Sequence, residues 1–236
     1  MLEAQENTRD YHAQALTWCG EFVVADKKRL ERFASLFGGK AGSGGRDVSR
    51  LILAASKSEN FPAFRNLCAL QEKLSPYKAQ GREYPQRDFG SGTLVSSEGM
   101  LTTSSTSPQD TPAKYVHAID ATPCNGDSFV TASKEKEPWA LVTLKGTVVL
   151  KGVVVENKGR NADQRKRQAP IEIEASDDGK TWRPVYSDEE ARETYRADLS
   201  RSEMRVRYVR VRRKSAKDNE EPFRLSKILV YGRKLY

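Results

Sequence analysis

The chain has 236 residues, of which 37% are hydrophobic and 31% are charged, and its formal net charge is +8. This composition is typical of one large or two small globular domains and argues against a disordered chain. No run approaches the roughly 20 apolar residues that span a bilayer, so we predict no membrane span. The first residues show no signal peptide, which leaves a cytosolic protein or a piece of a longer secreted chain.

The basic charge favours polyanionic partners such as nucleic acid, anionic lipid or acidic glycan, and the alternative is a solvated surface without a dedicated partner. Three cysteines do not make a disulfide framework, and with two histidines they show no zinc-ligand spacing. We therefore expect buried thiols and no zinc site. A single Cys19–Cys68 bridge stays open as an alternative.

Residues 1–75 are predicted to form a small all-α region with about four short helices over 10–75. Apolar residues recur there at i, i+3, i+4 and i+7, for example over 30–37 after the capping residue Asp26. Pro62 fits the first turn of the last helix. Residues 76–90 lack a helical or strand period and contain three aromatic residues, so they are predicted to be an ordered linker that packs on the next domain.

Catalysis has little support in the sequence. Cys19 lies within a predicted helix among apolar residues, which favours a buried structural thiol over a nucleophile. His12 is two helical turns away, about 10 Å, and too far to act as its base. No paired carboxylates, Ser/His/Asp set or phosphate loop is present, so we predict that the chain is not an enzyme.

Residues 91–236 change to a β pattern. Segments rich in β-branched and aromatic residues are separated by turn signals such as Asp177-Asp178-Gly179. Short strands without intervening helices predict a sandwich or barrel. The predicted strands are 148–155, 171–175, 208–211 and 225–231.

Several phrases of this region occur in the order found in discoidin domains, also called coagulation factor V/VIII type C domains. They are Ser-Ser (96–97), Ala-Ile-Asp (118–120), Asn-Gly-Asp-Ser-Phe (125–129), Pro-Trp-Ala-Leu-Val-Thr-Leu (138–144), Lys-Gly-Val-Val-Val (151–155), Ser-Asp-Asp-Gly-Lys-Thr-Trp (176–182), Arg-Tyr-Val-Arg-Val (207–211) and Leu-Ser-Lys-Ile-Leu-Val-Tyr-Gly (225–232). Residues 91–236 therefore resemble this family, which implies an all-β jelly-roll sandwich that is galactose-binding-domain-like and similar to family 32 carbohydrate-binding modules.

The resemblance also implies a structural calcium ion, held by an early loop and by a glutamate in the last strand. Asp120, Asp127 and Ser128 could supply oxygens here, but the glutamate position matches Lys227. A cation at that position opposes calcium, which needs 6–8 oxygen ligands. We expect no cofactor. Either the Lys227 ammonium replaces the ion, paired with Asp120 or Asp127, or it points to solvent.

Ligand-binding residues are implied by the same resemblance, because related modules bind ligands on loops at one end of the sandwich. The candidates are Asn157, Lys158 and Arg160 in the loop after the valine-rich strand, Phe223 as an aromatic platform, and His117. An arginine fork suits vicinal hydroxyls or a carboxylate, and an aromatic face suits a pyranose ring. The alternatives are a core role for Phe223 and a solvated turn for the loop.

The loop is also strongly basic, with five cations over residues 158–167, which favours anionic glycans over neutral galactose. Nucleic acid is disfavoured because no aromatic residues are interleaved for base stacking. The sequence thus predicts a non-catalytic carbohydrate-binding module in the C-terminal part of a larger secreted or surface protein, extracellular or periplasmic, from a bacterium. The alternative is an architectural or protein-binding discoidin domain packed against an upstream enzyme.

Overall fold

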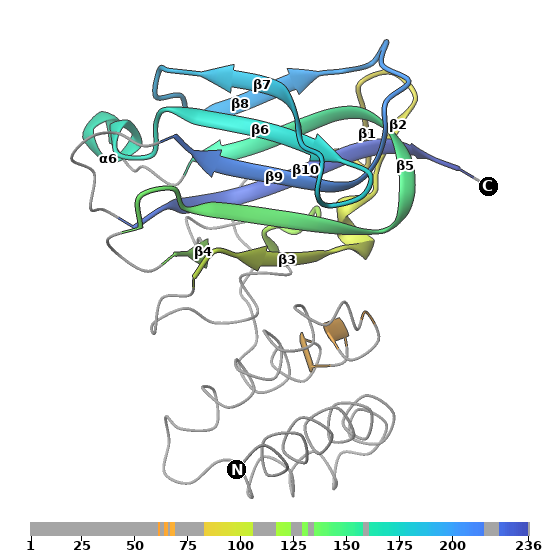
Figure 1. The fold of residues 1–236 in the computed structure, drawn as a ribbon, viewed down its shortest axis with the longest axis horizontal. Coiled ribbons are helices and arrows are strands. Elements are labelled where there is room, and N and C mark those ends of the chain that lie inside the picture. The colour runs from red at the N-terminus through yellow and green to blue at the C-terminus, as the bar shows by residue number, and fades with distance from the viewer. Residues whose placement is uncertain are drawn as a thin grey trace, which may run out of the picture. The chain divides into compact units, whose positions relative to one another are not determined.

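The computed structural model describes residues 83–105, 117–123, 129–131, 135–157, 161–214 and 222–235, together with residues 61, 64, 65, 67 and 68. The chain divides into two compact units, residues 1–77 with 111–113 and residues 78–110 with 114–236. Figure 1 shows the fold of the second unit. Its elements are β1 (Arg87–Asp88), β2 (Gly92–Leu94), η1 (Ser96–Glu98), β3 (Met100–Thr103), β4 (Phe129–Val130), β5 (Trp139–Asn157), α6 (Ala162–Lys166), β6 (Ile171–Ser176), β7 (Arg183–Asp188), β8 (Thr194–Asp198), β9 (Arg205–Arg213) and β10 (Arg224–Lys234).

In the first unit, the five described residues, between 61 and 68, are helical, and they lie within the last predicted helix. Cys68 is a buried free thiol, so it does not form the alternative bridge to Cys19. Burial raises the pKa of this thiol to about 12, and the opposing effect of the nearby Arg65 charge is smaller. Because almost no thiolate forms at neutral pH, Cys68 is unreactive. The other predicted helices, with Cys19 and His12, lie outside the described residues, so the all-α region stays a prediction.

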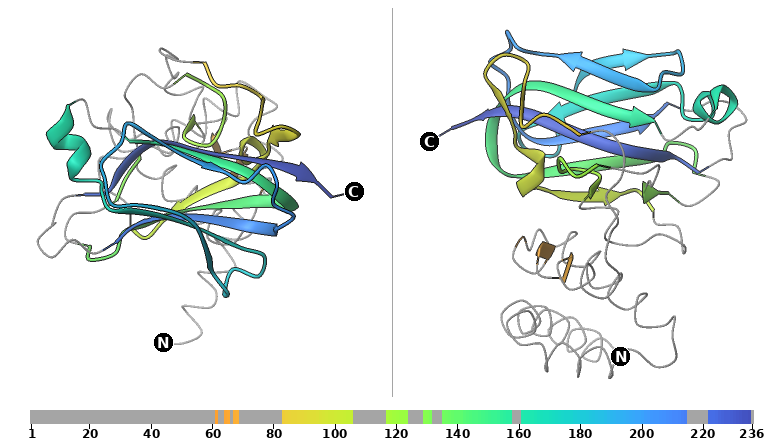
Figure 2. Two further views of the ribbon diagram at one scale, coloured as in Figure 1. Left: turned by 90° about the horizontal axis from the view of Figure 1, so that it is seen from above. Right: turned by 180° about the vertical axis from the view of Figure 1, so that it is seen from behind.

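The second unit is the predicted β-sandwich, and every strand pair among its described residues is antiparallel. The long strand β5 joins the two layers visible in Figure 2. Its first part pairs with β3 and β9, and β9 continues to β6 and β7. After a register shift between Thr143 and Val148, it pairs with β10 and β8, and Val148 and Val149 still pair with β9. We call β3, β9, β6 and β7 with the start of β5 the first sheet, and β1, β2, β4, β10 and β8 with the rest of β5 the second sheet.

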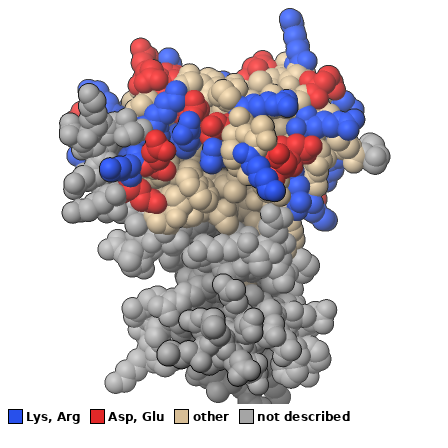
Figure 3. All heavy atoms as spheres, in the orientation of Figure 1, with Lys and Arg blue, Asp and Glu red and all other residues tan. Residues whose placement is uncertain are grey.

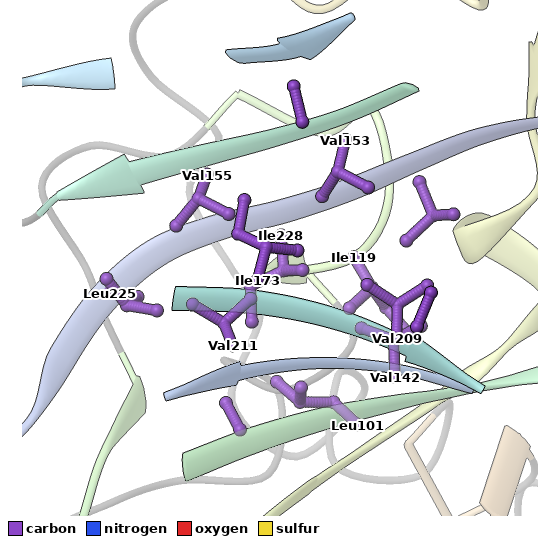
Figure 4. Packing of buried hydrophobic residues seen from close by; sticks show 14 of the residues in the cluster. Leu101, Ile119, Val142, Val153, Val155, Ile173, Val209, Val211, Leu225 and Ile228 are labelled. Atoms are coloured by element: carbon purple, nitrogen blue, oxygen red, sulfur yellow. The ribbon is translucent and has the colours of Figure 1, made fainter. Parts of the chain in front are cut away.

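The core lies between the sheets because alternate residues of each strand point inward. On β9, for example, Val209 and Val211 are fully buried, whereas Arg210 and Arg212 lie on the outer face. Figure 4 shows valine, leucine and isoleucine side chains of both sheets meeting in this layer. The four predicted strands are confirmed, and they fall within β5, β6, β9 and β10.

The turn after β6 is confirmed as well. The Asp178 carboxylate accepts hydrogen bonds from the backbone N–H groups of Lys180 and Thr181. Gly179 has a φ of 71°, a conformation that favours glycine. The chain can therefore reverse between β6 and β7 with the backbone N–H groups of Lys180 and Thr181 paired.

Residues 84–89, which we call the strap, cover the outer face of the second sheet. Phe89 packs with Leu94, Val154, Leu229 and Tyr231 in a second apolar cluster, separate from the main core. The Phe89 and Tyr231 rings meet edge to face at 5.5 Å between centroids. The expectation that aromatic residues before position 90 pack on the sandwich is therefore confirmed for Phe89.

Gly152 is required under the strap because its missing side chain makes room for the Phe89 ring. A Cβ atom at Gly152 would lie 2.3 Å from ring carbons of Phe89, closer than atoms can approach. Polar contacts hold the other end of the strap: the Tyr84 hydroxyl donates to Glu156 at 2.5 Å, and the Tyr231 hydroxyl donates to the Pro85 carbonyl at 3.0 Å. No helix among the described residues is long and apolar enough to cross a bilayer.

Candidate functional site

Four strand termini meet at one end of the sandwich, which we call the loop end. There β6 begins at Ile171 opposite Arg213, the last residue of β9, and β5 ends at Asn157 opposite Leu225, near the start of β10. The short helix α6 lies at this end, on the left in Figure 1. The predicted basic loop starts here, because Asn157 is its first residue.

Part of this loop is helical, which the sequence reading did not predict. Three buried polar side chains hold α6 and its C-terminal end on the sandwich. Asn157 Nδ2 donates to the Arg165 carbonyl at 3.2 Å, and a guanidinium nitrogen of Arg213 donates to the Arg167 carbonyl at 3.0 Å. Gln168 Oε1 accepts from the backbone N–H of Arg224 at 2.7 Å. Anchored backbone of this kind fixes where the attached side chains emerge.

Cationic side chains emerge from this anchored backbone. Lys166 and Arg167 are exposed, Arg165 is half-buried, and Arg224 is exposed at the start of β10. The cations of residues 158–167 were identified from the sequence, but no sequence pattern indicated that Arg224 lies beside them. The arrangement can attract an anionic group and donate several charge-assisted hydrogen bonds to it.

The five predicted ligand residues fall into different surroundings. Asn157 is 6% exposed, and its amide is committed to the backbone of α6, so it positions the loop. Phe223 is 0% exposed and packs in the main core, which corrects its prediction as a platform because no ring face reaches solvent. Lys158 and Arg160 lie outside the described residues. His117 is partly exposed and lies beside Asp120, with 3.4 Å between Nδ1 and Oδ2.

Lys227 is buried rather than exposed to solvent, which decides between the two alternatives given by the sequence. Its Nζ donates to the backbone carbonyls of His117, Asp120 and Thr122 and lies 3.6 Å from Asp120 Oδ1. Asp127, the other predicted partner, lies outside the described residues. A calcium ion does not fit beside Lys227, because the ammonium already occupies the point where these oxygens converge.

The Asp120 carboxyl is held in its charged form. Burial by itself would raise its pKa, but the contacts with His117, Lys227 and the Thr122 N–H outweigh burial and lower the pKa below its ordinary range. The negative charge of Asp120 therefore remains next to the Lys227 ammonium at neutral pH.

The outer face of the first sheet carries a row of ion pairs. Arg210 pairs with Glu174 at 2.8 Å, Arg212 pairs with Glu172 and Glu174, and Lys214 pairs with Glu172 at 3.1 Å. Figure 3 shows charges of both signs interspersed over the face in view. Carboxylates thus match the arginines and the lysine of this row, so the row offers no single-sign stripe to a polyanion.

Two of these ion pairs predict a pH dependence of stability. Burial would raise the pKa of Glu172, but hydrogen bonds from Arg212 and Lys214 lower it below the ordinary value of 4.5. Because the folded-state pKa is depressed, the stabilisation is present above about pH 4.5 and is lost as the pH falls through the folded-state pKa. Glu172→Gln should therefore lower the free energy of unfolding by about 1 kcal/mol at pH 7 and by much less at pH 3. Urea titrations at both pH values test this, and an equal difference at both would contradict it.

Comparisons with known proteins agree with this fold. No curated protein has a sequence that matches this chain significantly. A mutant of the lectin binding domain of Lectinolysin, complexed with Lewis b, is similar with a TM-score of 0.50 at 17% identity, over 64% of this chain and 100% of that one. A Streptococcus pneumoniae fucose binding module is similar with a TM-score of 0.48 at 18% identity, over 61% and 97% of the two chains. Residues 101–226, more than half of the sequence, match the family described as F5/8 type C domain, and the chain belongs to that family.

Proposed function

We propose that the sandwich is a non-catalytic carbohydrate-binding module whose ligand binds at the loop end. The observation that carries the proposal is the anchored basic segment: Asn157 and Arg213 hold the backbone from which Lys166 and Arg167 emerge. The domain with a TM-score of 0.50 is complexed with Lewis b, which supports a glycan as the ligand class. In this reading the module belongs to a larger secreted or surface protein and raises the local concentration of its attached domains near glycans.

The charge of the segment favours an anionic glycan, sialylated or sulfated, over neutral galactose. Exposed cations attract such a ligand through long-range electrostatics, which salt screens over about 8 Å at physiological ionic strength. Planar guanidinium groups such as that of Arg167 also match carboxylate and sulfate oxygens in a bidentate manner. We include Lys158 and Arg160 in the proposed site on the sequence alone.

Charge reversal at the loop end tests this assignment. The double variant Lys166→Glu/Arg167→Glu should weaken binding of an anionic glycan at least tenfold, because two charge-assisted contacts become repulsive. Arg160→Ala should weaken it by roughly 1–3 kcal/mol if that side chain makes a charge-assisted hydrogen bond. Calorimetric titration at two salt concentrations measures both effects, and wild-type affinity should fall as salt rises.

The matched control is Lys180→Glu/Arg183→Glu. Both residues are exposed and lie at the other end of β6, about 20 Å from its start, so the net charge changes equally at a remote place. Equal losses of affinity in the two double variants would show a general charge effect and would remove the loop end as the site.

The alternative function is architectural, and the strap favours it. Phe89 packs on the outer face of the second sheet, so the segment just before β2 is part of the folded sandwich. A domain of this kind would serve to hold an upstream enzyme rather than to bind a glycan. Failure of every glycan to bind at millimolar concentration would favour this function.

A further inference from the structure

Lys227 is fully buried, and the surroundings of its ammonium resemble those of a bound metal ion more than those of an ordinary ion pair. Nζ lies 3.0 Å from the Asp120 carbonyl oxygen, 2.6 Å from that of Thr122 and within hydrogen-bond distance of that of His117. Asp120 Oδ1 is 3.6 Å away, and the centroid of the Tyr84 ring is 4.9 Å away. The cation thus has four oxygens and one aromatic face around it.

Two other carbonyls of the same turn, those of Ala118 and Ile119, accept hydrogen bonds from other parts of the sandwich. The Ala118 carbonyl accepts from the backbone N–H of Ile228 at 2.7 Å, and the Ile119 carbonyl accepts from the Ser96 hydroxyl at 2.7 Å. The Asp120 side chain accepts from the Thr122 N–H at 2.9 Å. Hydrogen bonds to β10 and to η1, together with one bond inside the turn, hold the turn in a fixed conformation. The carbonyls that point at Lys227 are therefore held in place by the protein.

We propose that residues 117–122 form a cation site whose occupant is the protein's own Lys227 ammonium. The turn is therefore ordered without any divalent ion, and the same oxygens will accept a hard divalent cation when the ammonium is replaced. The chemistry fits, since calcium is bound by carbonyl and carboxylate oxygens and needs 6–8 of them. Four are present, and a glutamate at position 227 would bring up to two more. This inference does not depend on glycan binding.

Charge explains why the wild-type site excludes a metal. A divalent ion beside the ammonium would bring three positive charges together next to the Asp120 carboxylate, around a lysine side chain that is fully buried. In Lys227→Glu the net charge of the site changes from balanced to negative. The new carboxylate would lie near Asp120 and opposite Glu156, the partner of position 227 in the β5–β10 register. Three carboxylates close together repel one another unless a cation joins them.

The test is thermal unfolding of the full chain, in chelator and in millimolar calcium chloride. We expect Lys227→Glu to melt below the wild type in chelator and to gain roughly 5 °C or more with calcium, because a ligand that binds only the native state stabilises it. The wild type should change by less than about 1 °C. Asp120→Asn in the Lys227→Glu background should abolish the response.

Lys234→Glu is the matched control, because Lys234 is an exposed lysine on the same strand and gives the same change in charge. It should not respond to calcium. A wild-type rise of several degrees that Asp120→Asn suppresses would overturn the proposal, since a metal would then bind beside the lysine. A folded Lys227→Glu variant that ignores calcium would also overturn it.

A second variant decides the matter if Lys227→Glu does not fold. Lys227→Ala leaves the oxygens in place and removes the side chain that reaches them. Added n-propylammonium chloride should raise its melting temperature, whereas equal sodium chloride should not, because only the alkylammonium restores both the stem and the charge. Equal responses to the two salts would refute an ammonium site.

Discussion

Replacing Phe89 with alanine should lower the free energy of unfolding of the sandwich by about 3–5 kcal/mol. The ring is 8% exposed, packs on Tyr231 and fills the space above Gly152, and the Arg196 guanidinium lies 4.8 Å from its centroid. Truncation would leave a cavity on the outer face of the second sheet. Urea unfolding followed by tryptophan fluorescence measures the loss, with Trp18→Phe as background so that the signal comes from the sandwich.

Two further variants give losses of stability to compare with that of Phe89→Ala. Gly152→Ala should cost a comparable amount, because its Cβ would collide with the Phe89 ring. Tyr84→Phe removes only the hydroxyl that donates to Glu156 and should cost about 1 kcal/mol. A loss below 1 kcal/mol for Phe89→Ala would show that the strap is not part of the folded sandwich.

Arg213→Ala should cost about 3 kcal/mol, the second large effect that we expect. Arg213 is 1% exposed, its guanidinium donates to the Arg167 carbonyl, and it lies 6.0 Å from the centroid of the Phe223 ring. Truncation removes this bond and leaves a cavity between the end of β9 and α6. Hydrogen exchange should also show faster exchange of the Gln168 and Ala169 amides, which donate to α6 carbonyls.

Arg212→Ala is the control for this prediction. Arg212 is the neighbouring residue of the same type, but it lies on the outer face with its side chain 29% exposed. Its ion pairs with Glu172 and Glu174 are partly screened by solvent, so we expect a loss near 1 kcal/mol. Equal losses for the two arginines would mean that the buried anchor contributes no more than a surface ion pair.

The strands and the turn after β6 could be predicted from the sequence because their signals are local. Alternation along β9 separates Val209 and Val211 from Arg210 and Arg212 without knowledge of the fold. The same holds for the Asp-Asp-Gly turn, where one carboxylate and one glycine suffice. The resemblance placed Lys227 opposite an acidic loop but left open whether it replaces an ion or points to solvent, and only the structure shows that it is buried.

Other features depend on contacts between distant residues, which a sequence pattern does not show. The helix α6 consists of one alanine and four polar residues and has no apolar face, so no helical period marks it. An arginine is expected at the surface, and nothing local shows that Arg213 turns inward to the Arg167 carbonyl. The sequence left the role of Phe223 open, because an aromatic residue before a strand looks the same whether it faces solvent or the core.

The central claim, glycan binding at the loop end, is tested most directly by a glycan array probed with the full chain. The account predicts binding to sialylated, sulfated or galactose-terminated glycans, with the anionic ones retained best at low salt. Lys166→Glu/Arg167→Glu should lose the signal, and Lys180→Glu/Arg183→Glu should keep it. No binding to any of these glycans at millimolar concentration would contradict the claim.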